Sequence, residues 1–482
     1  MTATKTPAPG AVIATNSPAP GGMRELLAIA LPMVISNSCD TLMMFTTRVF
    51  LSWVHPEFMS AAMAGGLTSF MFLTFFIGLT GYSTALVAQY LGAGQPRRCP
   101  AVVGQALIIA IAAYPLVLLC IPVGHRMFAA AHLAPEQIGP QRQYFDILMY
   151  GGLLAILRSS LSGFFSGIGR TRVVMAATGV ALVVNLVVSY GLIFGHFGLP
   201  ALGIRGAALG TLSGSCAGVA VLAATYFGAA NRREFGVTAG LRLDPPLLRR
   251  LLRFGTPYGL EFFLNIMAFN VLVQTFHSYG VHEAAAMTIA FSWDMVSFVP
   301  LMGVNIGVIS LVGRYMGARD PDTAHRSTMS GLRMALVYSM CTFAVFSLFS
   351  HPLVEIFRTR NDAAAFAEVR PLAVFMVRLV ALYVMADAVG IVFGGALRGA
   401  GDTFRTMLLT VSGHWALALA GILLVRVFHV PPRVTWTVVV ALVICLGVIL
   451  YLRYRGGHWR RIRVVEAPPE GVAPGSLYSD PA

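Results

Sequence analysis

One carboxylate stands inside a long apolar run in the second half of the chain. Asp387 belongs to LYVMADAVGIVFGGALRGAGDT, residues 382–403, where its neighbours are apolar or small. An ionised carboxylate in hydrocarbon is costly, so it persists only beside a partner, a cavity, a bound cation or a transferable proton. Tyr383 precedes it by one helical turn and can present its hydroxyl on the same face. The spacing indicates a site for a proton or a cation such as Na⁺. The alternative is a structural Asp held by neighbouring hydroxyl or backbone groups.

Other ionisable residues also lie within apolar runs. Asp294, in FSWDMVSFVP, stands beside Trp293 and is suited either to attract an organic cation or to form structural hydrogen bonds. Asp40 lies in the first apolar run, and Arg158 and Arg378 lie well inside later ones. Because an unpaired guanidinium is poorly tolerated in hydrocarbon, we expect each arginine to pair with a buried acid.

The composition indicates that most of this chain lies within a lipid bilayer. Of its 482 residues, 57% are hydrophobic and 11% are charged, and its mean hydropathy is +0.74, which is typical of a polytopic membrane protein. The net charge of +14 comes largely from arginines between apolar runs, so it indicates membrane topology and not nucleic-acid binding. The six cysteines are scattered without CxxC spacing. We expect no structural metal, no cofactor and no enzymatic activity.

About twelve apolar runs are long enough to cross a bilayer, which takes about 20 helical residues. Arginines are concentrated in alternate connections, which places both termini in the cytoplasm by the positive-inside rule. We therefore predict an all-α, multi-pass protein. Its parts are a disordered cytoplasmic tail (1–22), an N-terminal lobe (23–230), a cytoplasmic linker (231–249), a C-terminal lobe (250–456) and a second cytoplasmic tail (457–482).

The two halves of the chain repeat each other. ALVAQYLGA, residues 85–93, recurs as SLVGRYMGA, residues 310–318, at an offset of 225 (310 − 85 = 225). Pro32 and Pro257 share that offset (257 − 32 = 225), and SGIGRTRVVM is similar to RGAGDTFRTM. Because each offset covers an even number of spans, the six-helix lobes share one orientation and are related by an axis along the membrane normal. Such parallel repeats are typical of transporters with a central cavity between the lobes.

Longer motifs resemble the multidrug and toxic compound extrusion (MATE) transporters. They are IALPMVIS, ALVAQYLGAG, NLVVSYGLIFGHFGLPALGIRGAALGT, FGTPYG, LVGRYMGA and ALRGAGDT, and the resemblance runs from about residue 29 to about residue 450. It implies a twelve-helix, two-lobed antiporter of the bacterial inner membrane, which exports cationic amphipathic compounds against an inward flow of H⁺ or Na⁺. We expect a monomer whose partners are the lipid bilayer and small organic cations.

The resemblance assigns cation-coupling residues in the second half. The bacterial NorM-type branch carries an Asp ten residues before the Leu-Arg-Gly of its tenth helix, with a Tyr one turn earlier, and these positions are Asp387 and Tyr383 here. The same branch carries a Glu where this chain has Asn265, and Glu261 lies one turn away on the same face. Either this second coupling carboxylate has moved by a turn, or Glu261 lines the substrate cavity.

The first half departs further from the family pattern. Many relatives carry an Asp in the first helix where this chain has Thr47, and archaeal relatives use an acid in the fifth helix where it has Ser189. The Asn of that fifth-helix site is kept as Asn185. These differences argue against a cation site in the first lobe, although Asp40, two turns before Thr47, is an alternative carboxylate for such a site. We favour the interpretation that Thr47, Asn185 and Asp40 line the substrate cavity, together with Asp294.

A lipid-linked oligosaccharide or polysaccharide flippase of the same wider superfamily is the alternative function. It shares the parallel-repeat plan, but it is expected to line its cavity with several cations, whereas this chain holds more buried acids. The coupling ion stays open between H⁺ and Na⁺. Sodium needs several oxygen ligands, of which Asp387 and Tyr383 supply two, whereas a proton needs one carboxyl group, so the sequence slightly favours protons.

Overall fold

The structure is a computed structural model that describes residues 19–130, 135–358 and 363–466. Within these ranges every regular element is a helix, as the sequence predicts. Only a helix satisfies all its backbone hydrogen bonds within a single segment, which is what a chain in hydrocarbon requires. Most of the two expected tails, residues 1–18 and 467–482, lies outside the described residues.

Eleven helices of the described chain are long and apolar enough to span a membrane. A twelfth span is formed if two further helices, which meet at a bend of 45°, are counted as one. This bent pair is α5 (Pro135–Tyr150) and α6 (Gly152–Gly167). The prediction of about twelve spans is therefore confirmed.

The N-terminal lobe is built from α1 to α8. Its other helices are α1 (Met23–Val54), α2 (Pro56–Gly81), α3 (Ser83–Gly92), α4 (Cys99–Ala130), α7 (Thr171–Phe194) and α8 (Ile204–Tyr226). A short helix, α9 (Ala229–Phe235), follows in the connection to the second lobe.

The C-terminal lobe is built from α10 to α16. Its helices are α10 (Pro245–His277), α11 (Val281–Gly317), α12 (Pro321–Leu348), α13 (Ser350–Glu355), α14 (Ala363–Ala400), α15 (Thr403–Ile422) and α16 (Pro432–Arg455). A π-helical turn, Leu423–Val427, extends α15.

Two helices of this lobe begin with the same local signal. Asp244 caps α10 by accepting a hydrogen bond from the Leu247 amide at 3.1 Å, and Asp320 caps α12 by accepting one from the Thr323 amide at 2.9 Å. Proline follows each Asp at the first helical position, where a missing amide hydrogen costs nothing.

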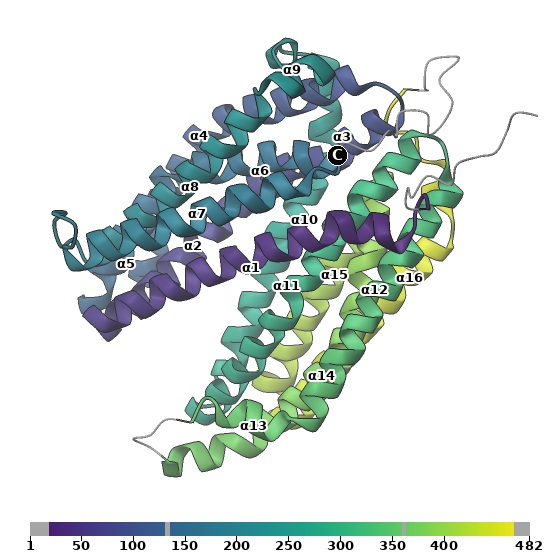
Figure 1. The fold of residues 1–482 in the computed structure, drawn as a ribbon. Helices are drawn as coiled ribbons and strands as arrows, with labels where there is room; N and C mark the ends of the chain where they lie inside the picture. The colour runs from purple at the N-terminus through teal and green to yellow at the C-terminus, as the bar shows by residue number, and fades with distance from the viewer. Residues whose placement is uncertain (1–18, 131–134, 359–362, 467–482) are drawn as a thin grey trace, which may run out of the picture.

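Figure 1 shows the two lobes approaching each other at the end that holds α3 and diverging toward the end that holds α5 and α13. The first helix of each lobe contacts the opposite lobe. Helix α1 packs on α11 as well as on α7, and α10 packs on α2 as well as on α15. Helix α14, which carries Asp387, packs against α11, α12 and α16 and forms the centre of the second lobe.

Two glycines allow the lobes to meet. Helix α3 passes α11 so closely that a Cβ atom at Gly92 would lie 1.8 Å from the carbonyl oxygen of Arg314. The repeat-related contact is equally tight, because a Cβ atom at Gly317 would lie 2.0 Å from the carbonyl oxygen of Gln89. Gly92 and Gly317 are separated by the repeat offset (317 − 92 = 225). The parallel repeat therefore appears in space as a symmetric contact between the lobes.

Hydrogen bonding reinforces this contact. Ser310 Oγ on α11 donates to the carbonyl oxygen of Ser166 on α6 at 2.7 Å, and both serines are buried. Nearby, α10 lies against α2, where a Cβ atom at Gly259 would come within 2.3 Å of the Phe75 carbonyl oxygen. We call the contacts of α3 and α6 with α11 the interlobe seal.

Candidate functional site

Two acids and a tyrosine come together in the C-terminal lobe. Asp294 on α11 lies beside the Tyr383 hydroxyl on α14 and is close enough to Asp387 for the two carboxylates to interact electrostatically. Asp294 and Tyr383 are each 7% exposed, and Asp387 is half-buried. The sequence predicts a place for Asp294 in the substrate cavity, separate from Asp387 and Tyr383. The structure adds it to that pair.

The charge of this acidic cluster is not compensated by an ion pair within the described part of the chain. Among the described residues, neither Asp294 nor Asp387 forms an ion pair, and the buried Asp294 Oδ1 has no hydrogen-bond partner. Two carboxylates this close in a medium of low polarity repel each other unless a proton or a cation neutralises them. The oxygen donors of both carboxylates and of the Tyr383 hydroxyl fit either a proton or a hard cation.

Glu261 forms a different kind of site. It is 2% exposed, and both of its carboxylate oxygens bind the guanidinium of Arg398, with Nε to Oε2 at 3.2 Å. Thr410 Oγ1 donates a further hydrogen bond to Oε1 at 2.7 Å. The Arg398 guanidinium also lies over the Tyr258 ring, 5.5 Å from its centroid. Glu261 is therefore neutralised here, in contrast to Asp387.

Asn265 lies one turn further along α10. Its Oδ1 is buried and has no hydrogen-bond partner among the described residues. Close enough to Glu261 to interact with it electrostatically, His414 on α15 places its Nδ1 2.8 Å from the Thr410 carbonyl oxygen. The sequence does not predict this neighbour, because a lone histidine in an apolar run gives no sign of what it faces.

In the N-terminal lobe, Asp40 is paired. Arg158 Nη2 lies 2.8 and 2.6 Å from its two carboxylate oxygens and 3.3 Å from Thr178 Oγ1. The expected pairing of Arg158 with a buried acid is found. Arg378 differs, because its Nε donates to Ser350 Oγ at 3.0 Å and it forms no ion pair within the described residues. The arginine that pairs with the remaining buried glutamate is Arg398, at the end of α14.

Thr47 and Asn185 lie together in the same lobe. Thr47 Oγ1 donates to the Met43 carbonyl oxygen at 2.9 Å and lies 3.4 Å from Asn185 Oδ1, while Asn185 Nδ2 reaches Thr211 Oγ1 at 3.5 Å. Both Thr47 and Asn185 are buried and neutral. This cluster therefore offers polar contacts and no charge.

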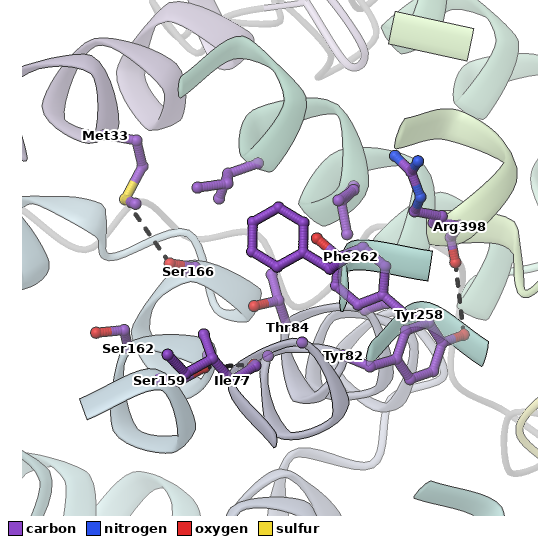
Figure 2. A pocket seen from close by; sticks show the side chains of 16 residues that line it. Met33, Ile77, Tyr82, Thr84, Ser159, Ser162, Ser166, Tyr258, Phe262 and Arg398 are labelled. Carbon is purple, nitrogen blue, oxygen red and sulfur yellow. Dashed lines mark hydrogen bonds between the residues drawn. The ribbon is translucent and has the colours of Figure 1, made fainter. Parts of the chain in front are cut away.

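A cavity of about 180 Å³ lies between the lobes. Figure 2 shows Ser159, Ser162 and Ser166 of α6 on one side and Tyr258 and Phe262 of α10 on the other. Arg398 also lines this cavity, whereas Asp40, Thr47, Asn185 and Asp294 do not. The hydroxyl groups and aromatic rings give it an amphipathic wall, adjacent to the pair of Glu261 and Arg398.

The fold and these sites define a multi-pass membrane transporter and not an enzyme. The MatE family model matches residues 32–191 and 257–421, and the chain belongs to this family. Among the described residues, no three His, Cys, Asp or Glu side chains are grouped to hold a metal ion.

Curated relatives and a solved structure agree with this assignment. A probable multidrug resistance protein NorM of Thermotoga maritima is 24% identical over 92% of this chain and 94% of its own. A protein of the same name from Bradyrhizobium diazoefficiens is 30% identical over 82% of this chain and 84% of its own. A structure described as the outward-facing conformation of a multidrug resistance MATE family transporter shares the fold. Its TM-score is 0.82 at 18% identity, and the match covers 90% of this chain and 95% of that one.

Proposed function

We propose that this protein exports cationic, amphipathic organic compounds across the bacterial inner membrane in exchange for inward H⁺ or Na⁺. The multidrug resistance names of its relatives support the export of drugs and toxins. The observation that carries the coupling proposal is the cluster of Asp294, Tyr383 and Asp387, in which two neighbouring carboxylates lack a compensating cation among the described residues.

The acidic cluster couples ion and compound through charge. When it is ionised, it attracts either a small cation or an organic one. Binding of a proton or Na⁺ neutralises it and weakens its hold on a cationic compound, which then leaves. Each ligand thus disfavours the other, and this negative coupling acts in both directions, as exchange requires. Asp387 and Asp294 hold the transferable charge, and the Tyr383 hydroxyl supplies a further oxygen or a hydrogen bond.

Glu261 has a second role in this scheme. Its charge is held by Arg398 and Thr410, so it cannot bind a cation unless Arg398 moves away. We propose that Glu261 and Arg398 position the aromatic wall of the cavity and influence which compounds enter it. Asp40, paired with Arg158, and the neutral Thr47 and Asn185 contribute polar surface in the other lobe without driving exchange.

The conformation is proposed to be closed toward the cytoplasm. The interlobe seal lies at the end of the bundle that carries Arg170 and Arg319, which the positive-inside rule assigns to the cytoplasm. Both described ends of the chain, near residues 19 and 466, lie at this same end (Figure 1). A monomer with both termini in the cytoplasm is the state we propose.

Efflux from proteoliposomes tests the proposal. A fluorescent organic cation is loaded, and a pH gradient or a Na⁺ gradient is imposed separately. We expect one of the two gradients to drive efflux and Asp387→Asn to abolish the response. Glu57→Gln, at an exposed acid near the start of α2, is the matched control.

The flippase alternative is tested in the same vesicles with a fluorescent lipid-linked sugar. The cavity argues against it, because Arg398 is the charged side chain among its lining residues and Glu261 neutralises it.

A further inference from the structure

The segment after the last spanning helix lies at the junction between the two lobes. Residues 462–466, here called the strap, follow α16 through a short turn. In this turn Trp459 is 1% exposed, and its Nε1 donates to the Tyr454 carbonyl oxygen at 2.9 Å. Arg453 Nη2 lies 2.6 Å from Asp402 Oδ2, which ties the end of α16 to the turn before α15. The strap therefore starts from a firmly held point on the C-terminal lobe.

The strap then passes directly over the glycine turn of that lobe. Gly401 has a φ of +98°, and a Cβ atom there would lie 2.3 Å from Val464 Cγ2 and 3.2 Å from Ile462 Cγ2. Any side chain at position 401 would push the strap away from the turn. This contact fixes how closely the strap lies against the glycine turn.

Beyond the turn, the strap packs where α3 of the N-terminal lobe meets the start of α10 of the C-terminal lobe. Val464 is 7% exposed and belongs to the same apolar cluster as Tyr90 of α3 and Leu247 at the start of α10. Ile462 and Val465 pack against that cluster. The apolar side chains of the strap are therefore removed from water by residues of both lobes, among them Tyr90 of α3, which favours the bound arrangement.

A charged contact anchors the end of the strap. The Glu466 carboxylate accepts hydrogen bonds from both terminal nitrogens of Arg250, at 3.1 and 2.7 Å. Arg250 also donates to the Tyr90 hydroxyl, and Arg98 is close enough to attract Glu466. A two-point contact between guanidinium and carboxylate fixes geometry as well as charge. The strap thus has one apolar and one charged anchor beside α3, the helix that forms the interlobe seal.

We propose that the strap is an interlobe latch, which holds the seal closed by keeping Arg250 and its own apolar side chains against Tyr90 of α3, and that these contacts with α3 must break when the carrier opens at this end. The strap is held on the C-terminal lobe by the turn around Trp459 and by Arg250 of α10, and it reaches the N-terminal lobe at Tyr90. The charged anchor is the more weakly held end of the strap, because the Glu466 side chain is 51% exposed whereas Trp459 is buried. The inference rests on alternating access as proposed above, but its test uses no transported ion or compound.

The test measures how often the seal opens. In a full-length, cysteine-free background, Ser310→Cys places a thiol in the seal, and its rate of reaction with a membrane-impermeant maleimide is measured in inside-out and right-side-out vesicles. Using both orientations makes the result independent of how the chain inserts. We expect Glu466→Gln to raise the labelling rate about two- to fivefold, as loss of an exposed ion pair permits. We expect Val464→Ala to raise it about tenfold, because it removes buried methyl groups.

Two further variants decide the outcome. Arg463→Gln is the matched control, because Arg463 lies in the strap and bonds to backbone carbonyl oxygens within residues 460–462; its labelling rate should not change. Arg250→Glu combined with Glu466→Arg should return the rate toward that of the parent. If the Glu466→Gln and Val464→Ala variants label at the parent rate, or if Arg463→Gln labels as fast as they do, the strap is not a latch. Ser166→Cys serves as a second reporter and must give the same order of rates.

Discussion

Gln89 and Arg314 occupy equivalent positions in the two repeats, and each reaches across to the glycine turn of the opposite lobe. Gln89 Nε2 donates to the Gly399 carbonyl oxygen at 2.7 Å, and Arg314 Nη2 donates to the Ile168 carbonyl oxygen at 3.0 Å. Both acceptors lie in the repeat-related segments SGIGRT and RGAGDT. Each lobe therefore donates one hydrogen bond to the other at this junction, from a side-chain amide in the N-terminal lobe and from a guanidinium in the C-terminal lobe.

The first prediction concerns the close approach at Gly92. A Cβ atom at position 92 would lie 1.8 Å from the Arg314 carbonyl oxygen, so Gly92→Ala should keep the lobes from closing. It should destabilise the sealed state by about 1 to 3 kcal/mol, as overpacking does. Maleimide labelling of Ser310→Cys should rise accordingly. Gly179→Ala, at a helical glycine with open space around it, should leave labelling unchanged. If Gly92→Ala and Gly179→Ala changed the labelling rate equally, the cause would be the higher helix propensity of alanine and not the contact between α3 and α11.

The second prediction concerns the buried pair of Glu261 and Arg398. Glu261→Gln leaves the Arg398 guanidinium buried without its counter-charge, which should cost about 3 to 5 kcal/mol of unfolding free energy. Removing both charges in Glu261→Gln with Arg398→Gln should cost less than the first change alone, because no isolated charge remains. Thermal unfolding of the detergent-solubilised variants measures this non-additivity.

The same variant separates two roles for Glu261. If purified Glu261→Gln keeps its fold but loses gradient-driven efflux of every compound, Glu261 belongs to the coupling site. Altered preference among compounds, with coupling retained, supports the positioning role proposed here.

Local and repetitive features of this protein could be predicted from sequence, and long-range pairings could not. The spans follow from apolar length, and Asp387 and Tyr383 share a face because helical spacing requires it. The 225-residue offset identifies positions that are equivalent in the two lobes, and Gly92 and Gly317 are such a pair. These conclusions depend on periodicity and not on how helices pack.

The remaining site features depend on packing between helices. Glu261 and Arg398 are 137 residues apart, and nothing in either segment indicates that α10 brings one beside the other. Asp294 joins Asp387 because α11 lies along α14. Arg378 illustrates the converse error: its place inside an apolar run predicts an acidic partner, but its side chain is exposed in the structure and its Nε donates to the Ser350 hydroxyl.

The third prediction is a pH dependence of the strap. Hydrogen bonding by Arg250 lowers the pKa of Glu466 below its ordinary value of 4.5. The charged contact is therefore fully present above pH 4.5 and is lost as the pH falls through the lower pKa of the bound state. Amide hydrogen exchange of residues 462–466, corrected for intrinsic rates, should accelerate in that acidic range. Glu466→Gln should exchange faster already at neutral pH and should lack this transition.

The fourth prediction is topological. Single cysteines at Gly94, Arg170 and Arg319 should react with an impermeant reagent only from the cytoplasmic side, because these positions lie in arginine-rich connections. Labelling in intact cells and in inside-out vesicles measures this directly. Reaction in intact cells would reverse the orientation and would place the seal on the outer side.

The last prediction concerns Asp387 and Asp294 together. Asp387→Asn keeps the size and hydrogen bonding of the side chain but fixes the neutral form, so the variant should resemble the cation-loaded state and should not use a gradient. Asp294→Asn should have a comparable effect, because the two carboxylates interact electrostatically and neither forms an ion pair within the described residues. Tyr383→Phe removes one oxygen and no charge, so it should weaken coupling without abolishing it.

Dye efflux from proteoliposomes, driven by an imposed pH or Na⁺ gradient, compares these three variants. Asp40→Asn provides the matched control, because its carboxylate is already neutralised by Arg158 and lies in the other lobe. It should fold less stably but respond to the gradient. Efflux by a well-expressed Asp387→Asn variant that still rises with the gradient would remove Asp387 from the coupling site. If Asp294→Asn alone lost the response, the ion would be carried on α11 and not on α14.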